Sequence, residues 1–209
     1  MERYLTELAT AFVRGRLVNS TAGIQDGVEA GLRLHKFKAN AELPRVRKVL
    51  GILRSLQPDR VLDVGSGRGT FLWPLLEAFP ELPVTSIELS EIRARDIAAV
   101  CAGGVKRLSV ARMHAEHMAF RARSFDVVTI LEVLEHLRNP HLALAASLQV
   151  ARRFVVVSVP STPDDNPEHL HLFTQNQLEQ MAFDAGAAHI AFEHRSEERR
   201  VGKECRSRW

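Results

Sequence analysis

Residues 61–71 constrain the fold of this chain more than any other stretch. A strand-like apolar segment over residues 61–64 runs into three glycines at alternate positions, Gly65, Gly67 and Gly69. Glycine has no side chain to block close approach and reaches backbone angles that are closed to other residues. The sequence therefore predicts a strand, a tight turn and a helix, with a nucleoside bound against the turn.

The spacing of the glycines separates the known nucleotide-binding loops. The nicotinamide and flavin fingerprint G-x-G-x-x-G needs its third glycine where this chain has Thr70. A phosphate-binding P-loop ends in Gly-Lys-Ser/Thr, but here Gly69 is followed directly by Thr70 without a lysine. The spacing excludes the P-loop and disfavours a nicotinamide oxidoreductase.

The remaining pattern, strand-Asp-x-Gly-x-Gly-x-Gly, resembles that of the class I S-adenosylmethionine-dependent methyltransferases. The resemblance covers about residues 56–193. It implies S-adenosyl-L-methionine as the cofactor, with its methionine and ribose parts against the glycine turn and Asp63 shaping the loop. The residues of the turn that the resemblance places against the cofactor are Gly65, Ser66, Gly67 and Gly69.

Two further positions fit a nucleoside site. A second predicted strand, residues 83–89, carries Glu88 near its end, about 20 residues beyond the glycines, where a carboxylate can accept hydrogen bonds from both ribose hydroxyls. After a third strand, residues 108–112, the resemblance implies a small-acidic pair near adenine. Here His114 takes the place of the acid and is followed by Ala115, so histidine would make the adenine contact.

Strand and helix patterns alternate along the chain, which predicts a Rossmann-like α/β fold with a doubly wound, mostly parallel sheet and helices on both faces. We expect the fold to lack the last antiparallel strand of the family, because only the suspected tail stands in its place. The predicted strands after the first three are residues 125–131, 154–160 and 188–193, and the strand over 154–160 is apolar enough to be central. The predicted helices are residues 42–56, 71–79, 90–102, 141–150 and 178–185. A Thr-x-x-Gln capping box at Thr174 and Gln177 begins the last helix.

The segment after the fourth strand carries the candidate chemistry. Glu132, Glu135 and His136 stand at i, i+3 and i+4, so a helix would bring them to one face. Ligands of open α/β sheets bind outside the carboxyl ends of the strands, where this segment and the glycine turn both lie. We expect Glu132 to line the cofactor cleft, His136 to act as a base for acceptors that need one, and Glu135 to orient it.

A metal-dependent alternative exists for the same segment. It resembles the magnesium- or manganese-dependent small-RNA 2'-O-methyltransferases, which implies Glu132, Glu135, His136 and either His171 or His169 as metal ligands. The metal would lower the pKa of a ribose hydroxyl. We favour a site without metal, because the body of the chain has no basic surplus for RNA.

We expect three regions: a helical lid or cap over residues 1–55, the methyltransferase domain over 56–194, and a non-native or disordered tail over 195–209. The tail holds six Lys or Arg and three Asp or Glu, which accounts for the whole net charge of +3. It resembles a recurrent read-through tail of translated metagenomic sequence; a natural basic arm is the alternative.

Composition argues against a membrane protein, a secreted protein and a disulfide-rich protein. No apolar run approaches the roughly 18 to 20 residues of a membrane span, and the amino terminus lacks the pattern of a secretion signal, so we expect a cytoplasmic protein. Two cysteines, Cys101 and Cys205, are too few for a disulfide framework. The expected function is methyl transfer from S-adenosylmethionine to an oxygen, nitrogen or carbon acceptor, with a small molecule favoured over nucleic acid; a non-catalytic binding protein is the further alternative.

Overall fold

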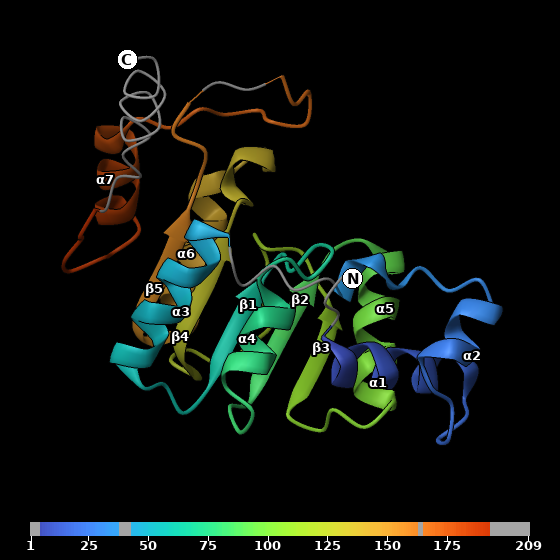
Figure 1. Ribbon diagram of the computed structural model, residues 1–209. Helices are drawn as coiled ribbons and strands as arrows, with labels where there is room; N and C mark the ends of the chain where they lie inside the picture. The colour runs from blue at the N-terminus through green and yellow to red at the C-terminus, as the bar shows by residue number, and fades with distance from the viewer. Residues whose placement is uncertain (1–4, 38–42, 163–164, 193–209) are drawn as a thin grey trace, which may run out of the picture.

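The computed structural model describes residues 5–37, 43–162 and 165–192. They form a five-stranded sheet with helices on both faces, in the strand order β3-β2-β1-β4-β5 (Figure 1). All four strand pairings in this part of the chain are parallel. The predicted Rossmann-like, doubly wound architecture is confirmed, and its switch point lies between β1 and β4, where the order of the strands reverses.

The bounds of the elements agree closely with the sequence patterns over most of the chain. The strands are β1 (Val61–Val64), β2 (Val84–Glu88), β3 (Leu108–Arg112), β4 (Phe125–Leu131) and β5 (Ala151–Ser158). The helices are α1 (Thr6–Leu17), α2 (Ile24–Glu29), α3 (Pro44–Leu56), α4 (Leu72–Ala78), α5 (Glu91–Ala102), α6 (Pro140–Val150) and α7 (Gln175–Asp184), with the 3-10 helices η1 (Leu34–Phe37) and η2 (Leu134–His136). The predicted capping box is present at the start of α7.

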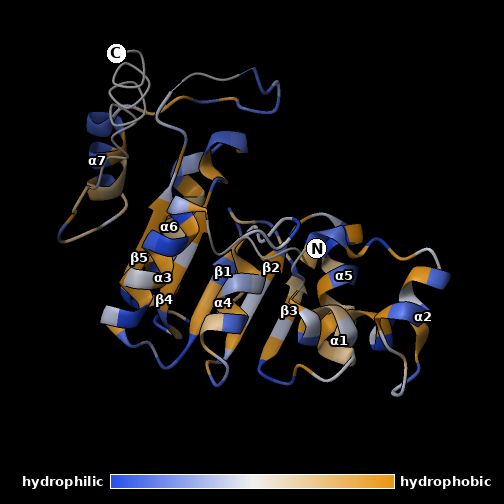
Figure 2. Ribbon diagram, in the orientation of Figure 1, coloured by the Kyte–Doolittle hydropathy of each residue, from blue (hydrophilic) through white to orange (hydrophobic). Residues whose placement is uncertain are grey.

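The sheet separates two hydrophobic cores. Val61 and Leu62 are neighbours on β1, yet Val61 packs with α1, α3, α4 and α5, whereas Leu62 packs with α6. This follows from the pleat, which turns successive side chains to opposite faces. Figure 2 shows the strands as mainly apolar between helices whose outer sides are polar. A strand buried on both faces reads as a continuous apolar run, as β4 does.

The N-terminal helices share the core of the sheet's first face. Helix α1 packs directly on α5 (Figure 1), because a Cβ on Gly15 would lie 1.9 Å from the carbonyl oxygen of Ala99. A Cβ on Gly103 would likewise lie 1.7 Å from the carbonyl oxygen of Ala11. The backbones of the two helices therefore touch, and Lys36 adds an ion pair to Asp96 of α5.

Two predictions about the end of the sheet are wrong for the described residues. Residues 188–192 form no strand, so the predicted sixth strand over 188–193 is not present in this part. Strand β5, which was expected to be central, therefore forms an edge of the described sheet, and Phe154 is 44% exposed. An apolar run cannot be central unless a partner strand pairs with its outer edge.

Two other expectations concern the suspected tail and the absence of a membrane span. The suspected tail over 195–209, with Cys205, lies outside the described residues. Within the described residues, none of the helices has the length and apolar character needed to cross a membrane.

Candidate functional site

The glycine turn follows β1 and contains three residues with left-handed backbone angles. Gly65, Gly67 and Gly69 have φ of 69°, 58° and 83°. A Cβ on Gly65 would lie 2.6 Å from Val133, and one on Gly69 would lie 2.0 Å from the Trp73 ring, whereas one on Gly67 would meet only a carbonyl oxygen at 3.8 Å. Two of the glycines are therefore required by packing inside the protein, and Gly67 is the one with open space in front of it.

A buried carboxylate at the end of β1 supports the turn. Asp63 accepts hydrogen bonds from the hydroxyl of Ser66 and, at 2.8 Å, from that of Thr129. The Ser66 oxygen also lies 2.7 Å from the Ser86 hydroxyl oxygen of β2. Burial raises the pKa of Asp63 to about 6, with the charge of Glu88 adding to the rise and the two hydroxyls opposing it. This geometry gives Asp63 the loop-shaping position that the resemblance implies.

Glu88 at the end of β2 is tied to the same turn. Its Oε2 accepts the Gly67 N–H at 2.8 Å, and its Oε1 accepts the Ser90 N–H at 2.8 Å, with the residue only 5% exposed. The sequence pointed to ribose hydroxyls as its partners, and the bond to the glycine turn was missed. A carboxylate oxygen can accept more than one hydrogen bond, so the ribose contact stays a prediction.

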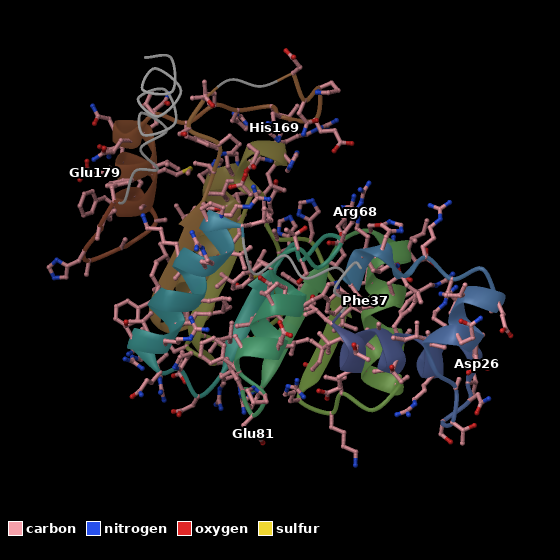
Figure 3. All side chains as sticks on the ribbon, viewed as in Figure 1. Asp26, Phe37, Arg68, Glu81, His169 and Glu179 are labelled. Atoms are coloured by element: carbon pink, nitrogen blue, oxygen red, sulfur yellow. The ribbon has the colours of Figure 1, made fainter. Side chains whose placement is uncertain are left out.

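A cavity of about 150 Å³ lies at the carboxyl ends of β1 and β4. The glycine turn and Arg68 line one side, and Glu132 and Ser158 line another. Arg45, at the start of α3, also lines the cavity. Sequence reasoning missed Arg45 and Ser158, because only the packing of α3 and the pairing of β5 bring them here. Figure 3 shows Arg68 and His169 along the same edge of the sheet.

A larger hollow of about 430 Å³ lies elsewhere, between α6 and α7, and is lined by His141, Met181 and Asp184 among others. It contains none of the predicted site residues. We assign the candidate site to the smaller cavity, because the glycine turn and the switch point of the sheet meet there.

The expected helical face over residues 132–137 is not formed. Only residues 134–136 are helical, as the 3-10 helix η2, and Glu132 lies before it with a left-handed φ of 55°. The carboxylate of Glu132 instead accepts the Ser158 hydroxyl at 2.7 Å. The i, i+3, i+4 prediction is wrong because Glu132 lies between the end of β4 and the start of η2 and does not belong to the helix.

Glu135 and His136 lie on η2, beside the loop that follows β5. Glu135 is fully buried, and neither carboxylate oxygen has a hydrogen-bond partner in the part of the chain that the structure describes. Burial raises the pKa of Glu135, and the charge of Glu132 contributes. The Nδ1 of His136 lies 3.0 Å from the carbonyl oxygen of Glu168, and its ring centroid lies 4.7 Å from that of His169.

Three of the five candidate ligands in the metal alternative form a cluster, and the other two have hydrogen-bond partners of their own. The ligand atoms of Glu135, His136 and His169 lie within 4.8 Å of one another. The carboxylate of Glu132 binds Ser158, and the Nε2 of His171 lies 2.9 Å from the Leu137 carbonyl oxygen. His136 and Glu135 do not line the cavity at the glycine turn.

The predicted adenine contacts lie on the loop after β3. The Nδ1 of His114 accepts the Glu116 N–H at 3.2 Å, and Ala115 is buried at 9% exposure. Glu116 accepts the Asn139 N–H at 3.2 Å, which ties the loop to the start of α6. Neither His114 nor Ala115 lines the cavity, so their contacts with adenine stay predictions.

Comparison with known proteins shows the family to which this chain belongs. The family model described as a methyltransferase domain matches residues 37–197, which is more than half of the chain. That range begins before α3 and includes the glycine turn and all five strands. It thus covers every residue of the candidate site.

Individual relatives and structures resemble this chain over shorter stretches. The malonyl-[acyl-carrier protein] O-methyltransferase of Geobacter sulfurreducens is 29% identical over 107 residues, 50% of this chain and 40% of that protein. The ubiquinone biosynthesis O-methyltransferase of Aromatoleum aromaticum is 33% identical over 108 residues, 44% of this chain and 39% of that protein. The N-terminal domain of EvdMO1, crystallised with SAH bound, superposes with a TM-score of 0.57 at 18% identity and covers 73% of this chain and 75% of that one. The matches thus span about two fifths of the length of the two curated relatives, and the structural likeness describes the fold.

Proposed function

The chain belongs to the methyltransferase-domain family, and from that premise we propose that it transfers the methyl group of S-adenosylmethionine to an oxygen atom of a small-molecule acceptor. The observation that carries the proposal is the hydrogen bond from the N–H of Gly67, which lines the cavity, to the carboxylate of Glu88, which is not part of the lining. It joins the two elements that a ribose would contact and holds Gly67 with its open side available.

The charges around the cavity support a zwitterionic ligand. Arg45 lies on the α3 side, and Glu132 lies on the side of β4. The methionine end of the cofactor carries a carboxylate and an ammonium group, which Arg45 and Glu132 complement in sign. The hydroxyl of Ser158 donates to Glu132 and fixes the direction of its carboxylate. We assign Arg45 to the carboxylate and Glu132 to the ammonium group.

Catalysis at such a site is mainly a matter of position. Bound S-adenosylmethionine supplies a sulfonium methyl group that is already activated. The protein must hold the acceptor in line with that group and exclude water, and this alignment can account for much of the rate. Val46, Val49 and Phe71 give the cavity an apolar side suited to excluding water. His136 lies outside the lining, so the proposal does not need it as a base.

The choice of acceptor rests on the relatives. The curated proteins that match this chain carry names of O-methyltransferases, one for a malonyl group on acyl-carrier protein and one in ubiquinone biosynthesis. An oxygen nucleophile on a small organic group is common to both names. A methyl-transfer assay should therefore compare a phenol, a carboxylate on acyl-carrier protein, and RNA. Transfer to RNA alone would contradict a small-molecule acceptor.

The cofactor site is tested by calorimetric titration of S-adenosylhomocysteine into the full chain. We expect binding by the wild-type protein and none by Gly67→Arg, whose side chain would fill the open side of the turn. Gly31→Arg is the matched control, because Gly31 has φ of 70° and nothing within 4 Å of a Cβ but lies after α2, away from the turn. A folded wild-type protein that does not bind the ligand would refute the proposal.

The assignment of Arg45 is tested in the same titration. Arg45→Ala should weaken binding roughly tenfold, the usual effect of losing one hydrogen bond to a charged group. Arg47→Ala removes a charge from the same helix without touching the cavity lining. Equal weakening by both variants would indicate a general effect of charge and would contradict the assignment.

A further inference from the structure

We propose that the segment over residues 5–37, which precedes the sheet, positions the glycine turn through a row of three aromatic rings. This aromatic row consists of Phe12 on α1, Phe37 on η1 and Trp73 on α4. The ring centroids of Phe12 and Phe37 lie 5.2 Å apart, and those of Phe37 and Trp73 lie 5.0 Å apart. The inference rests on the proposed function and deepens it, because it names residues that set the affinity of the same cofactor site.

Trp73 forms the end of the aromatic row that touches the glycine turn. Its Nε1–H donates a hydrogen bond of 3.0 Å to the carbonyl oxygen of Arg68. Its backbone N–H donates to the carbonyl oxygen of Gly69 at 3.0 Å, and a Cβ on Gly69 would lie 2.0 Å from Nε1. The indole thus lies against the backbone of the two residues that follow Gly67, so a shift of the ring shifts the turn.

Phe37 is the middle ring of the row and is held by two helices. It is 0% exposed, and its carbonyl oxygen accepts the N–H of Leu5, the residue before α1, at 2.8 Å. The neighbouring Lys36 forms an ion pair with Asp96 of α5, and its Nζ lies 4.7 Å from the centroid of the Phe12 ring. The position of Phe37 is therefore set by α1 and α5, neither of which lines the cavity at the glycine turn.

The packing of the three rings lets the row transmit position. Phe12 and Trp73 are 2% and 1% exposed. Protein interiors are close-packed and compress little, and aromatic pairs at such distances have preferred geometries. A smaller, flexible side chain in place of Phe37 would leave Trp73 free to take other positions, and Arg68 would follow it; Phe37 and Arg68 are both labelled in Figure 3. The turn would then hold its ligand-binding arrangement for only part of the time, which lowers the apparent affinity by the same fraction.

Calorimetric titration of S-adenosylhomocysteine into variants of the full chain tests the row. Phe37→Leu should weaken binding roughly tenfold, which corresponds to a turn that is correctly arranged for about a tenth of the time. Phe12→Leu changes the next ring, so it should give a smaller loss in the same direction, and it takes the place of Phe37→Leu if that variant does not fold.

Leu108→Ala is the matched control. Leu108 belongs to the same core cluster as the three rings, and the substitution removes as many carbon atoms as Phe37→Leu. It lies at the start of β3, however, whereas the turn follows the end of the parallel strand β1. Both variants should melt at a lower temperature than the wild-type protein, but only Phe37→Leu should lose affinity.

Two measurements on the protein without ligand separate positioning from stability. The Gly69 N–H donates to the Ser66 carbonyl oxygen at 2.8 Å, so its hydrogen exchange reports on the turn. Compared at the same interval below their melting temperatures, Phe37→Leu should exchange this proton faster than Leu108→Ala. With Trp209→Phe as the background, Trp73 is the only tryptophan, and its emission should shift in Phe37→Leu and stay at the wild-type wavelength in Leu108→Ala.

Equal losses of affinity in Phe37→Leu and Leu108→Ala would overturn the proposal, since they would indicate a general effect of lower stability. Wild-type affinity in a folded Phe37→Leu would contradict it as well, and so would Gly69 exchange and Trp73 emission that match those of the control. If the wild-type protein binds no ligand, the proposed function fails, and the exchange and emission measurements decide whether the row positions the turn. The two failures are therefore distinguishable.

Discussion

The buried acids near the carboxyl ends of β1, β2 and β4 differ in their hydrogen-bond partners. Asp63, near the carboxyl end of β1, accepts hydrogen bonds from two hydroxyls, and Glu88 at the end of β2 accepts them from two backbone N–H groups. Glu135 after β4 has neither kind of partner in the described part of the chain. The first region is thus preorganised by internal hydrogen bonds, whereas the second has a negative group that is still to be satisfied.

The largest expected effect tests how rigid the first region is. Gly69→Ala should lower the free energy of unfolding by about 3 kcal/mol, because its φ is 83° and the new Cβ would lie 2.0 Å from Trp73. Gly67→Ala should cost only about 1 kcal/mol, the usual penalty for a left-handed residue in open space. Urea unfolding measures both variants. Equal losses would show that backbone strain alone, and not packing, fixes the turn.

The second test uses pH to examine Asp63. Its pKa is raised to about 6 in the folded protein from 3.8, so the folded state holds this proton more tightly than the unfolded state. The contribution of Asp63 to stability is therefore greatest below about pH 4 and is lost as the pH rises through about 6, by on the order of 3 kcal/mol. The difference in unfolding free energy between wild type and Asp63→Asn should follow this decline. A difference that is flat or rises over that range would contradict the raised pKa.

The smallest effect concerns the second region. Glu135→Met should leave the free energy of unfolding unchanged or raise it by about 1 kcal/mol, because it replaces a buried carboxylate that has no hydrogen-bond partner among the described residues with an apolar side chain. Thermal unfolding of the wild-type protein and the variant measures the difference. A large loss of stability in the variant would reveal a partner for Glu135 and remove the contrast between the regions.

Much of the fold was predictable because its strands are short apolar runs, of which β1, β2 and β4 are almost entirely buried. The runs over residues 108–112 and 125–131 became β3 and β4 with the expected bounds, and the family model confirms the resemblance drawn from the glycine turn. The expected strand over 188–193 failed for residues 188–192, because a strand exists only if its partner is present. The local sequence pattern of a segment does not reveal whether a partner strand is present.

The candidate site was predictable only where one short segment builds it. The turn follows from residues 61–69, and the role of Asp63 was implied by the family resemblance, whereas the bond from Thr129 to Asp63 comes from β4. Arg45 enters the cavity because α3 packs over the turn, and Glu132 departs from the helical face because it takes a left-handed φ where β4 ends. Both depend on contacts between distant parts of the chain, which a periodicity in the sequence cannot reveal.

The contact between α1 and α5 has a mechanical consequence. With Gly15 against Ala99 and Gly103 against Ala11, the two helices meet backbone to backbone and have no compressible side chains between them. A displacement of α5 must therefore carry α1 with it. Helix α5 begins next to Ser90, whose N–H holds the Glu88 carboxylate. The first helix of the chain thus acts as a brace, and its position sets how far the carboxylate that faces the glycine turn can move.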